Sequence, residues 1–257
     1  MEQEKILQSL EDIIKDISPD YLILDTSVLG ANFLNGNRDV HLNSAYGRDK
    51  NLQDSEIRLY LHSTVESINF LERHKNTIVP SEVIKEFERG LRLVTDCATN
   101  FGDVRGFTKR RPIQRKSKGE MKTIKKLERI GNLYQAILEE INKRVIDERV
   151  IDERDYTEEL YLEELSKSLI TATDRNPNNE KIMFASMLYG IRNKSHVALI
   201  TKNKRFNEIL SFIKRNLDIS REYSRNIAEF LEEGKMNIVF GDKNGFKAQC
   251  RSSDYIS

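Results

Sequence analysis

The chain is poor in the residues that build disulfide frameworks and zinc sites. Its 257 residues include only two cysteines, Cys97 and Cys250, which lie far apart and outside any CxxC pattern. We therefore expect free thiols in a reducing compartment and no structural zinc. The histidines form no pair at metal-ligand spacing, so the sequence does not indicate histidine-based catalysis. They are His41, His62, His74 and His196.

The sequence also lacks a long apolar run, and we expect no signal peptide in its first residues. The longest apolar stretch, IMFASML at residues 182–188, is far shorter than the ~20 residues that span a membrane. The first ten residues, MEQEKILQSL, are too acidic and polar for a signal peptide. We expect a cytoplasmic protein with no membrane partner.

An excess of one sign of charge is absent too, since 42 basic residues stand against 41 acidic ones. Attraction to a polyanion must then come from local clustering. Residues 105–129 contain eleven bases and two acids, whereas residues 139–164 contain eleven acids and four bases. Either the basic run contacts nucleic-acid phosphates, or the two runs form oppositely charged faces of a helical hairpin. The candidate nucleic-acid-binding residues are Arg110, Arg111, Arg115, Lys116, Lys118 and Lys122.

Apolar periodicity predicts alternating helices and short strands. Helical spacing covers residues 3–18, 59–71, a segment beginning at Ser81, residues 178–191 and most of 205–233. Short apolar runs predict strands at YLIL, NTIVP, HVALIT and NIVF, the last followed by a polar tail, and residues 30–55 read as a loop. Fully apolar strands are typical of a parallel sheet buried on both faces. The expected fold class is α/β, with a parallel β-sheet sandwiched by helices.

The charged block interrupts this pattern. We expect residues 1–90 and 173–257 to form the α/β core, with residues 91–172 as a helical charged insertion.

Polar side chains stand where the predicted strands end. Asp25 follows the first strand, Glu86 lies on the helix after the second, Asn179 precedes the next helix, and Asn203 follows the HVALIT strand. Because ligands of open parallel sheets bind outside the carboxyl ends of the strands, these positions are expected to face one crevice. Taken alone, Asp25 also fits the N-cap of a helix.

Four segments in this order resemble the acidic motifs of the PIN domain, a nuclease fold: LILDTSVL, VPSEVIKEF, NNEKIMFASML and LITKNKRF. The resemblance covers residues 21–90 and 175–240, and it implies a PIN-like sheet. It also implies a metal-dependent ribonuclease that holds Mg²⁺ or Mn²⁺ through Asp25, Glu86, Asn179 and Asn203. Ser27 and Thr201 fall on supporting polar positions.

Asn179 and Asn203 depart from this family, which usually carries Asp at both positions. An amide oxygen can bind a cation but contributes no charge, so we expect weaker metal binding and reduced or lost activity. Three interpretations stay open: a naturally degenerate site, an active site in which Asp174, Glu180 or Glu82 replaces the lost charge, or engineered substitutions.

Two functional classes therefore compete. The first is a candidate Mg²⁺- or Mn²⁺-dependent endoribonuclease, whose long insertion is also similar to that of the protein-only ribonuclease P of some prokaryotes. The alternative is a non-catalytic RNA-binding or protein-interaction module on the same fold. Expected partners are RNA, a second copy of the chain in a homodimer, and a protein bound through the helical insertion.

Overall fold

Five strands pair into one sheet in the order β2-β1-β3-β4-β5. They are β1 (Tyr21–Leu24), β2 (Thr77–Ile78), β3 (Val197–Thr201), β4 (Met236–Asp242) and β5 (Gly245–Cys250). The computed structural model describes residues 2–34, 54–100, 118–145, 178–217, 222–242 and 245–250. Strands β1 to β4 run parallel, and β5 pairs antiparallel with β4 at the edge. The α/β class and the parallel sheet core agree with the expectation from sequence.

The central strands are apolar because both faces of the sheet are covered. All five residues of β3 are buried, as are Leu22 to Leu24 of β1. The pairing register sets Leu24 opposite Ile200, so both strands end at the same level, immediately before Asp25 and at Thr201. This register brings the polar residues that follow the two strands to one edge.

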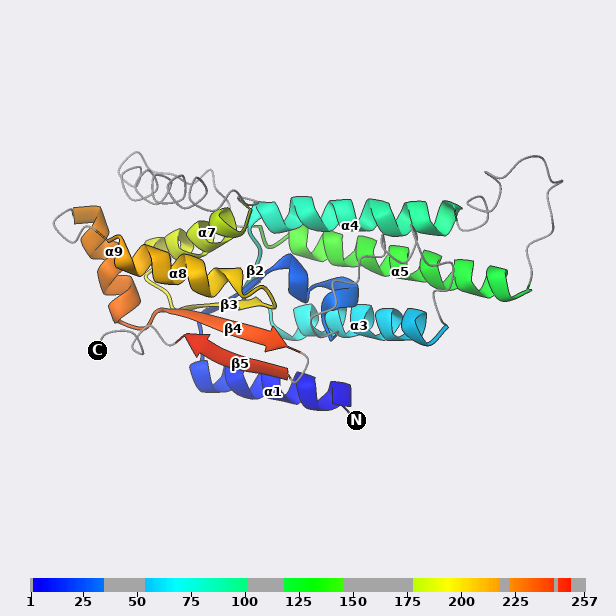
Figure 1. Cartoon of the computed structure of the whole chain (residues 1–257), viewed down its shortest axis with the longest axis horizontal. Helices are drawn as coiled ribbons and strands as arrows, with labels where there is room; N and C mark the ends of the chain where they lie inside the picture. Colours follow the sequence, from blue (N-terminus) through cyan, green and yellow to red (C-terminus); the bar gives the residue numbers. More distant parts are fainter. Residues whose placement is uncertain are drawn as a thin grey trace.

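Helices surround the sheet on both sides (Figure 1). Helix α1 (Glu2–Ile17) packs against β5, while α7 (Asn178–Asn193) contacts β3, α8 (Arg205–Arg215) and α9 (Glu222–Glu232). A group of long helices lies beside the sheet, where α5 (Lys118–Asn142) packs against both α3 (Asp54–Arg73) and α4 (Ser81–Asn100). Two short 3₁₀ turns, Thr26–Val28 and Gly30–Asn32, follow β1.

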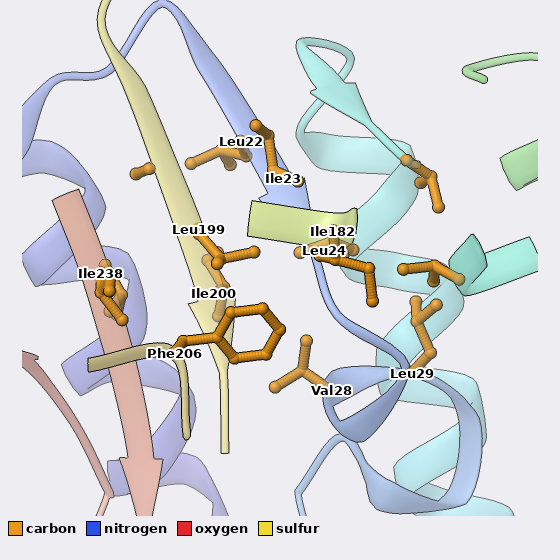
Figure 2. Packing of buried hydrophobic residues seen from close by; sticks show 14 of the residues in the cluster. Leu22, Ile23, Leu24, Val28, Leu29, Ile182, Leu199, Ile200, Phe206 and Ile238 are labelled. Atoms are coloured by element: carbon orange, nitrogen blue, oxygen red, sulfur yellow. The ribbon is translucent and has the colours of Figure 1, made fainter. Parts of the chain in front are cut away.

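The apolar core joins the sheet to the segment after β1. Figure 2 shows Phe206 of α8 between Ile200 of β3 and Val28 of the first 3₁₀ turn. All three side chains are fully buried. Burying large apolar side chains of this kind contributes roughly 1.5–3 kcal/mol each, so the core fixes the chain on either side of Asp25.

Part of the predicted insertion shares this core. Ile130, Tyr134, Ile137 and Ile141 of α5 belong to the same buried cluster as the sheet residues. Residues 101–117 and 146–177 lie outside the described part of the chain, so the division into core and insertion stays a prediction.

One local expectation was wrong. The residues after β4 were expected to be a polar tail, but 245–250 form strand β5, whose Phe246 is buried. Helix α7 begins at Asn178, as the helical spacing over residues 178–191 predicts, so Asn179 lies in its first turn and does not precede it. Of residues 30–55, expected to be a loop, 30–32 form a 3₁₀ turn and 54–55 belong to α3, while 35–53 are outside the described residues. None of the described helices is long and apolar enough to cross a membrane.

Candidate functional site

Asp25 sits buried at the carboxyl end of β1, held by hydroxyl groups. Its Oδ2 accepts hydrogen bonds from Ser27 Oγ at 2.5 Å and from Thr201 Oγ1 at 2.7 Å. Its backbone N–H donates to the carbonyl of Ile200 at 3.1 Å, which extends the β1–β3 pairing by one residue. Ser27 and Thr201, expected to support the first acidic position, both contact Asp25.

The electrostatic environment of Asp25 disfavours its charge. Burial is the largest cause and raises the pKa of Asp25 above its ordinary value, and the negative charge of Glu86 raises it further. The hydrogen bonds from Ser27 and Thr201 act in the opposite direction but do not cancel the effect. A cation bound beside Asp25 would favour the ionised carboxylate and so offset both the cost of burial and the repulsion from Glu86.

Glu86 reaches the same edge of the sheet from the second turn of α4. Thr26 Oγ1 donates to Glu86 Oε2 at 2.7 Å, and Asn178 Nδ2 donates to Glu86 Oε1 at 2.6 Å. Both carboxylate oxygens are therefore oriented, one by the residue after Asp25 and the other by the residue before Asn179.

The two asparagines bond to each other. Asn203 Nδ2 donates to Asn179 Oδ1 at 3.1 Å, which joins the turn after β3 to the first turn of α7. Asn203 Oδ1 accepts from the backbone N–H of Arg205 at 3.0 Å, and its own N–H donates to Thr201 Oγ1 at 3.0 Å. Since this hydrogen-bond pattern assigns the amide orientation, Asn179 contributes an oxygen to the pair and Asn203 contributes an N–H.

All four predicted site positions thus belong to one network at the edge of the sheet. The network runs from Asp25 through Thr201 to Asn203, then to Asn179 and, through its neighbour Asn178, to Glu86. It draws on β1, α4, α7 and the turn between β3 and α8. The ionisable groups of the network are the two carboxylates of Asp25 and Glu86.

The described acids that could replace a missing carboxylate, Glu180 and Glu82, make other contacts. Glu180 is 1% exposed, and its Oε1 accepts from Arg205 Nη2 at 3.1 Å, so a cation matches its charge. Glu82, one turn before Glu86, accepts from Ser81 Oγ at 3.2 Å. Asp174 lies outside the described residues. Within the described ranges, no group of three or more Asp, Glu, His or Cys side chains could hold a metal ion.

Residues of this network could hold one hard dication. Asp25 and Glu86 offer charged oxygens, and Asn179 offers an amide oxygen that accepts a hydrogen bond from Asn203. Magnesium in proteins takes oxygen ligands and is commonly held by one or two carboxylates together with waters and substrate phosphates. With only two charges, these residues would bind such an ion weakly.

Lys202 fixes the backbone behind Asp25. Its N–H donates to Ser27 Oγ at 2.9 Å, and its Nζ donates to the carbonyls of Asn32 and of Phe33, the latter at 3.0 Å. Burial lowers the pKa of Lys202 to about 7. The lysine after the β3 strand therefore holds the segment that follows Asp25.

Tyr134 connects α5 to both sides of the site. Its hydroxyl accepts from the N–H of Ala31 at 3.0 Å, and its ring stacks on Phe87, the neighbour of Glu86, with centroids 4.8 Å apart. Gly30 has a φ of +58°, and a Cβ there would lie 2.7 Å from the tyrosine ring. Helix α5 thus packs directly against the segment after Asp25 and the helix that carries Glu86.

Several contacts of the site were not predicted. No sequence motif indicated these contacts, although one of the residues, Asn178, stands beside a predicted position. The residues are Thr26, Asn178, Tyr134 and the Arg205–Glu180 pair. Arg110, Arg111, Arg115 and Lys116 lie outside the described residues. Lys118 and Lys122 belong to α5, but their side chains are also outside the described part, so their role in nucleic-acid binding stays a prediction.

Comparison of the chain with protein-family models, with curated proteins and with solved structures finds no match. A relation to PIN domains therefore stays a prediction from the motif pattern.

Proposed function

We propose that the chain is a PIN-like ribonuclease that hydrolyses RNA phosphodiester bonds with one weakly held Mg²⁺ or Mn²⁺ ion, and that its activity is reduced by Asn179 and Asn203. The observation that carries this proposal is the network at the carboxyl edge of the parallel sheet. Four segments far apart in sequence contribute Asp25, Glu86, Asn179 and Asn203 to it. Ligand sites of open parallel sheets lie at this edge.

The chain's own residues have distinct roles in this proposal. Asp25 and Glu86 supply the charged ligands, and the hydroxyls of Ser27, Thr201 and Thr26 hold them in place. When bound, the ion supplies Lewis-acid polarisation of the phosphodiester and lowers the pKa of a water molecule. The Asn203–Asn179 hydrogen bond orients the amide oxygen of Asn179 within the same network.

A second candidate is a non-catalytic RNA-binding or protein-interaction module on the same fold. It is favoured by the Asn203–Asn179 hydrogen bond, in which two amides satisfy each other where the family usually has two charged ligands. In that case the crevice binds its partner without cleavage.

Cleavage of a labelled single-stranded RNA pool in Mn²⁺ separates the two candidates. The chain is compared with the double variant Asn179→Asp plus Asn203→Asp, which restores two carboxylates. Asp25→Ala is also introduced into each of the two proteins, because it removes a carboxylate that the proposed cleavage needs in either background. Glu82→Gln is the matched control, since Glu82 is an acid on the same helix face outside the network.

The proposal predicts weak cleavage by the chain, stronger cleavage by the double variant, and no cleavage after Asp25→Ala in either background. RNA binding without cleavage by the chain, together with cleavage by the double variant, identifies the binding module. Cleavage that survives Asp25→Ala, or a double variant that never cuts, would contradict the assignment of this site.

A further inference from the structure

The charged side chains that the structure shows exposed on α4 are all positive. Among its side chains whose exposure the structure describes, Ser81 to Arg92 and Thr95, the exposed ones are Lys85, Arg89, Arg92 and Thr95. The three cations are four and three residues apart, so they lie within about 60° of one another around the helix. They form a single stripe, which we name the α4 stripe.

The described acids of α4 are placed differently. Glu82, Glu86 and Glu88 are half-buried, and Glu86 is engaged at the candidate site. Glu88 stands three residues after Lys85 and four before Arg92 but makes an ion pair with neither. An ordinary solvated helix face mixes both signs and gains from pairs three or four residues apart. Glu140 near the end of α5 makes such a pair with Lys143, which directly follows the helix. No cation of the α4 stripe makes an ion pair with any described residue.

Exposed lysines also flank the other site residues. Lys181 is two positions after Asn179 on α7, and Lys204 directly follows Asn203. Lys85 itself directly precedes Glu86. Each of the three elements that contribute Glu86, Asn179 and Asn203 therefore carries an exposed cation close in sequence to its site residue, and within the described ranges neither Lys181 nor Lys204 makes an ion pair.

We propose that the α4 stripe binds the phosphate backbone of a single-stranded nucleic acid and leads it to the crevice, where Lys181 and Lys204 contact the flanking phosphates. The stripe extends over about 10 Å along α4, from Lys85, the neighbour of Glu86, to Arg92. Such a backbone carries regularly spaced negative charges, and exposed cations without acidic partners bind them through counterion release. The inference rests on the proposed function, since it delivers a phosphodiester to Asp25 and Glu86.

The test compares two charge-matched triple variants. In the stripe variant, Lys85→Gln, Arg89→Gln and Arg92→Gln remove the three cations. The control variant carries Lys15→Gln, Lys75→Gln and Lys194→Gln, exposed cations that precede β1, β2 and β3 and so lie at the opposite edge of the sheet. Both lose three positive charges, and thermal melting verifies that both fold.

Binding to fluorescent 20-nucleotide RNA and DNA is measured by anisotropy from 0.1 to 1 M salt, with EDTA present so that cleavage does not interfere. Each lost phosphate contact lowers the slope of log affinity against log salt by about 0.7 for single strands, so the stripe variant loses a slope of about 2. Its RNA affinity is then about 100-fold weaker at 0.1 M salt and equal to that of the unchanged chain near 1 M. The control variant keeps the original slope.

RNA binding stronger than DNA binding assigns the stripe to RNA, and equal binding assigns it to single strands of either kind. Equal losses in both triple variants, no loss in the stripe variant, or no binding by the unchanged chain would overturn the inference. An RNA affinity that depends on the stripe, in a chain that does not cleave RNA, supports the inference and refutes only the enzymatic function. Cleavage that is equal in the stripe variant and the unchanged chain at 0.1 M salt refutes the stripe alone.

Discussion

Removing Arg205 is expected to destabilise the fold strongly, because it would leave a buried carboxylate without its cation. The side chains of Arg205 and Glu180 are 11% and 1% exposed, and Nη2 lies 3.1 Å from Oε1. The other oxygen, Glu180 Oε2, is buried and makes no hydrogen bond to the described residues. The guanidinium is therefore the group that compensates this charge.

The magnitude follows from the asymmetry of buried ion pairs. Breaking such a pair by removing one partner costs about 3–5 kcal/mol, whereas replacing both partners by apolar residues is often neutral or stabilising. For a chain of this size, the loss corresponds to a fall of roughly 6–20 °C in Tm. Arg205 also contacts Glu208 at 2.7 Å, but Glu208 is 59% exposed, and that pair contributes about 1 kcal/mol or less.

Urea denaturation followed by circular dichroism measures the effect in three variants. Arg205→Met is expected to lose about 3–5 kcal/mol in the free energy of unfolding, whereas the double variant Glu180→Met plus Arg205→Met recovers most of it. Glu208→Gln, the control for the exposed pair, stays within about 1 kcal/mol of the unchanged chain. A loss below about 1 kcal/mol for Arg205→Met, or a double variant no more stable than the single one, would refute the reasoning.

Three further predictions concern the residues around the site. Tyr134→Phe removes the hydroxyl that accepts a hydrogen bond from the N–H of Ala31 and is expected to lower the free energy of unfolding by about 0.5–1.5 kcal/mol in urea, while an unchanged value would show that the contact is dispensable. Gly30→Ala adds a Cβ 2.7 Å from Tyr134 at a φ of +58° and should lower Tm, whereas the control Gly90→Ala meets the same ring at 3.8 Å and should not; equal Tm values would refute this. Because burial lowers the pKa of Lys202 to about 7, the unfolded chain binds a proton between pH 7 and 10.5 that the folded chain does not, so stability from this group rises with pH across that window. Lys202→Met should flatten the rise in urea titrations at several pH values, and a rise that persists would assign it to other groups.

The sheet could be predicted because its strands are short and apolar throughout. The runs YLIL and VALIT each match an observed strand. A strand covered on both faces is apolar at nearly every position, so it appears in the sequence as a short continuous apolar run. Strand β5 was missed, although the Asn-Gly pair at 244–245 is typical of a hairpin turn. Its polar residues, such as Lys247, suit an edge strand, and the same polarity suggested a tail.

The four site positions could be anticipated because parallel strands bring their carboxyl ends to one edge. Their hydrogen-bond partners could not, because these depend on the rotation and depth of helices packed against the sheet. Asn178 and Asn179 are neighbours, yet the first contacts Glu86 and the second contacts Asn203. Tyr134 contacts Ala31 across 103 residues of sequence, and only the packed fold brings them together.

Mn²⁺-dependent thermal melting of the chain and of Asp25→Asn tests the central claim most directly, because it requires no knowledge of the RNA substrate. The raised pKa of Asp25 means that its ionised form is unfavourable in the fold, so at neutral pH the neutral asparagine is expected to raise Tm without metal. Mn²⁺ should raise the Tm of the chain, since a ligand that binds only the folded state stabilises it, and should leave that of Asp25→Asn almost unchanged. An equal response of both proteins to Mn²⁺, or none in the chain, would contradict a cation site built on Asp25 and Glu86.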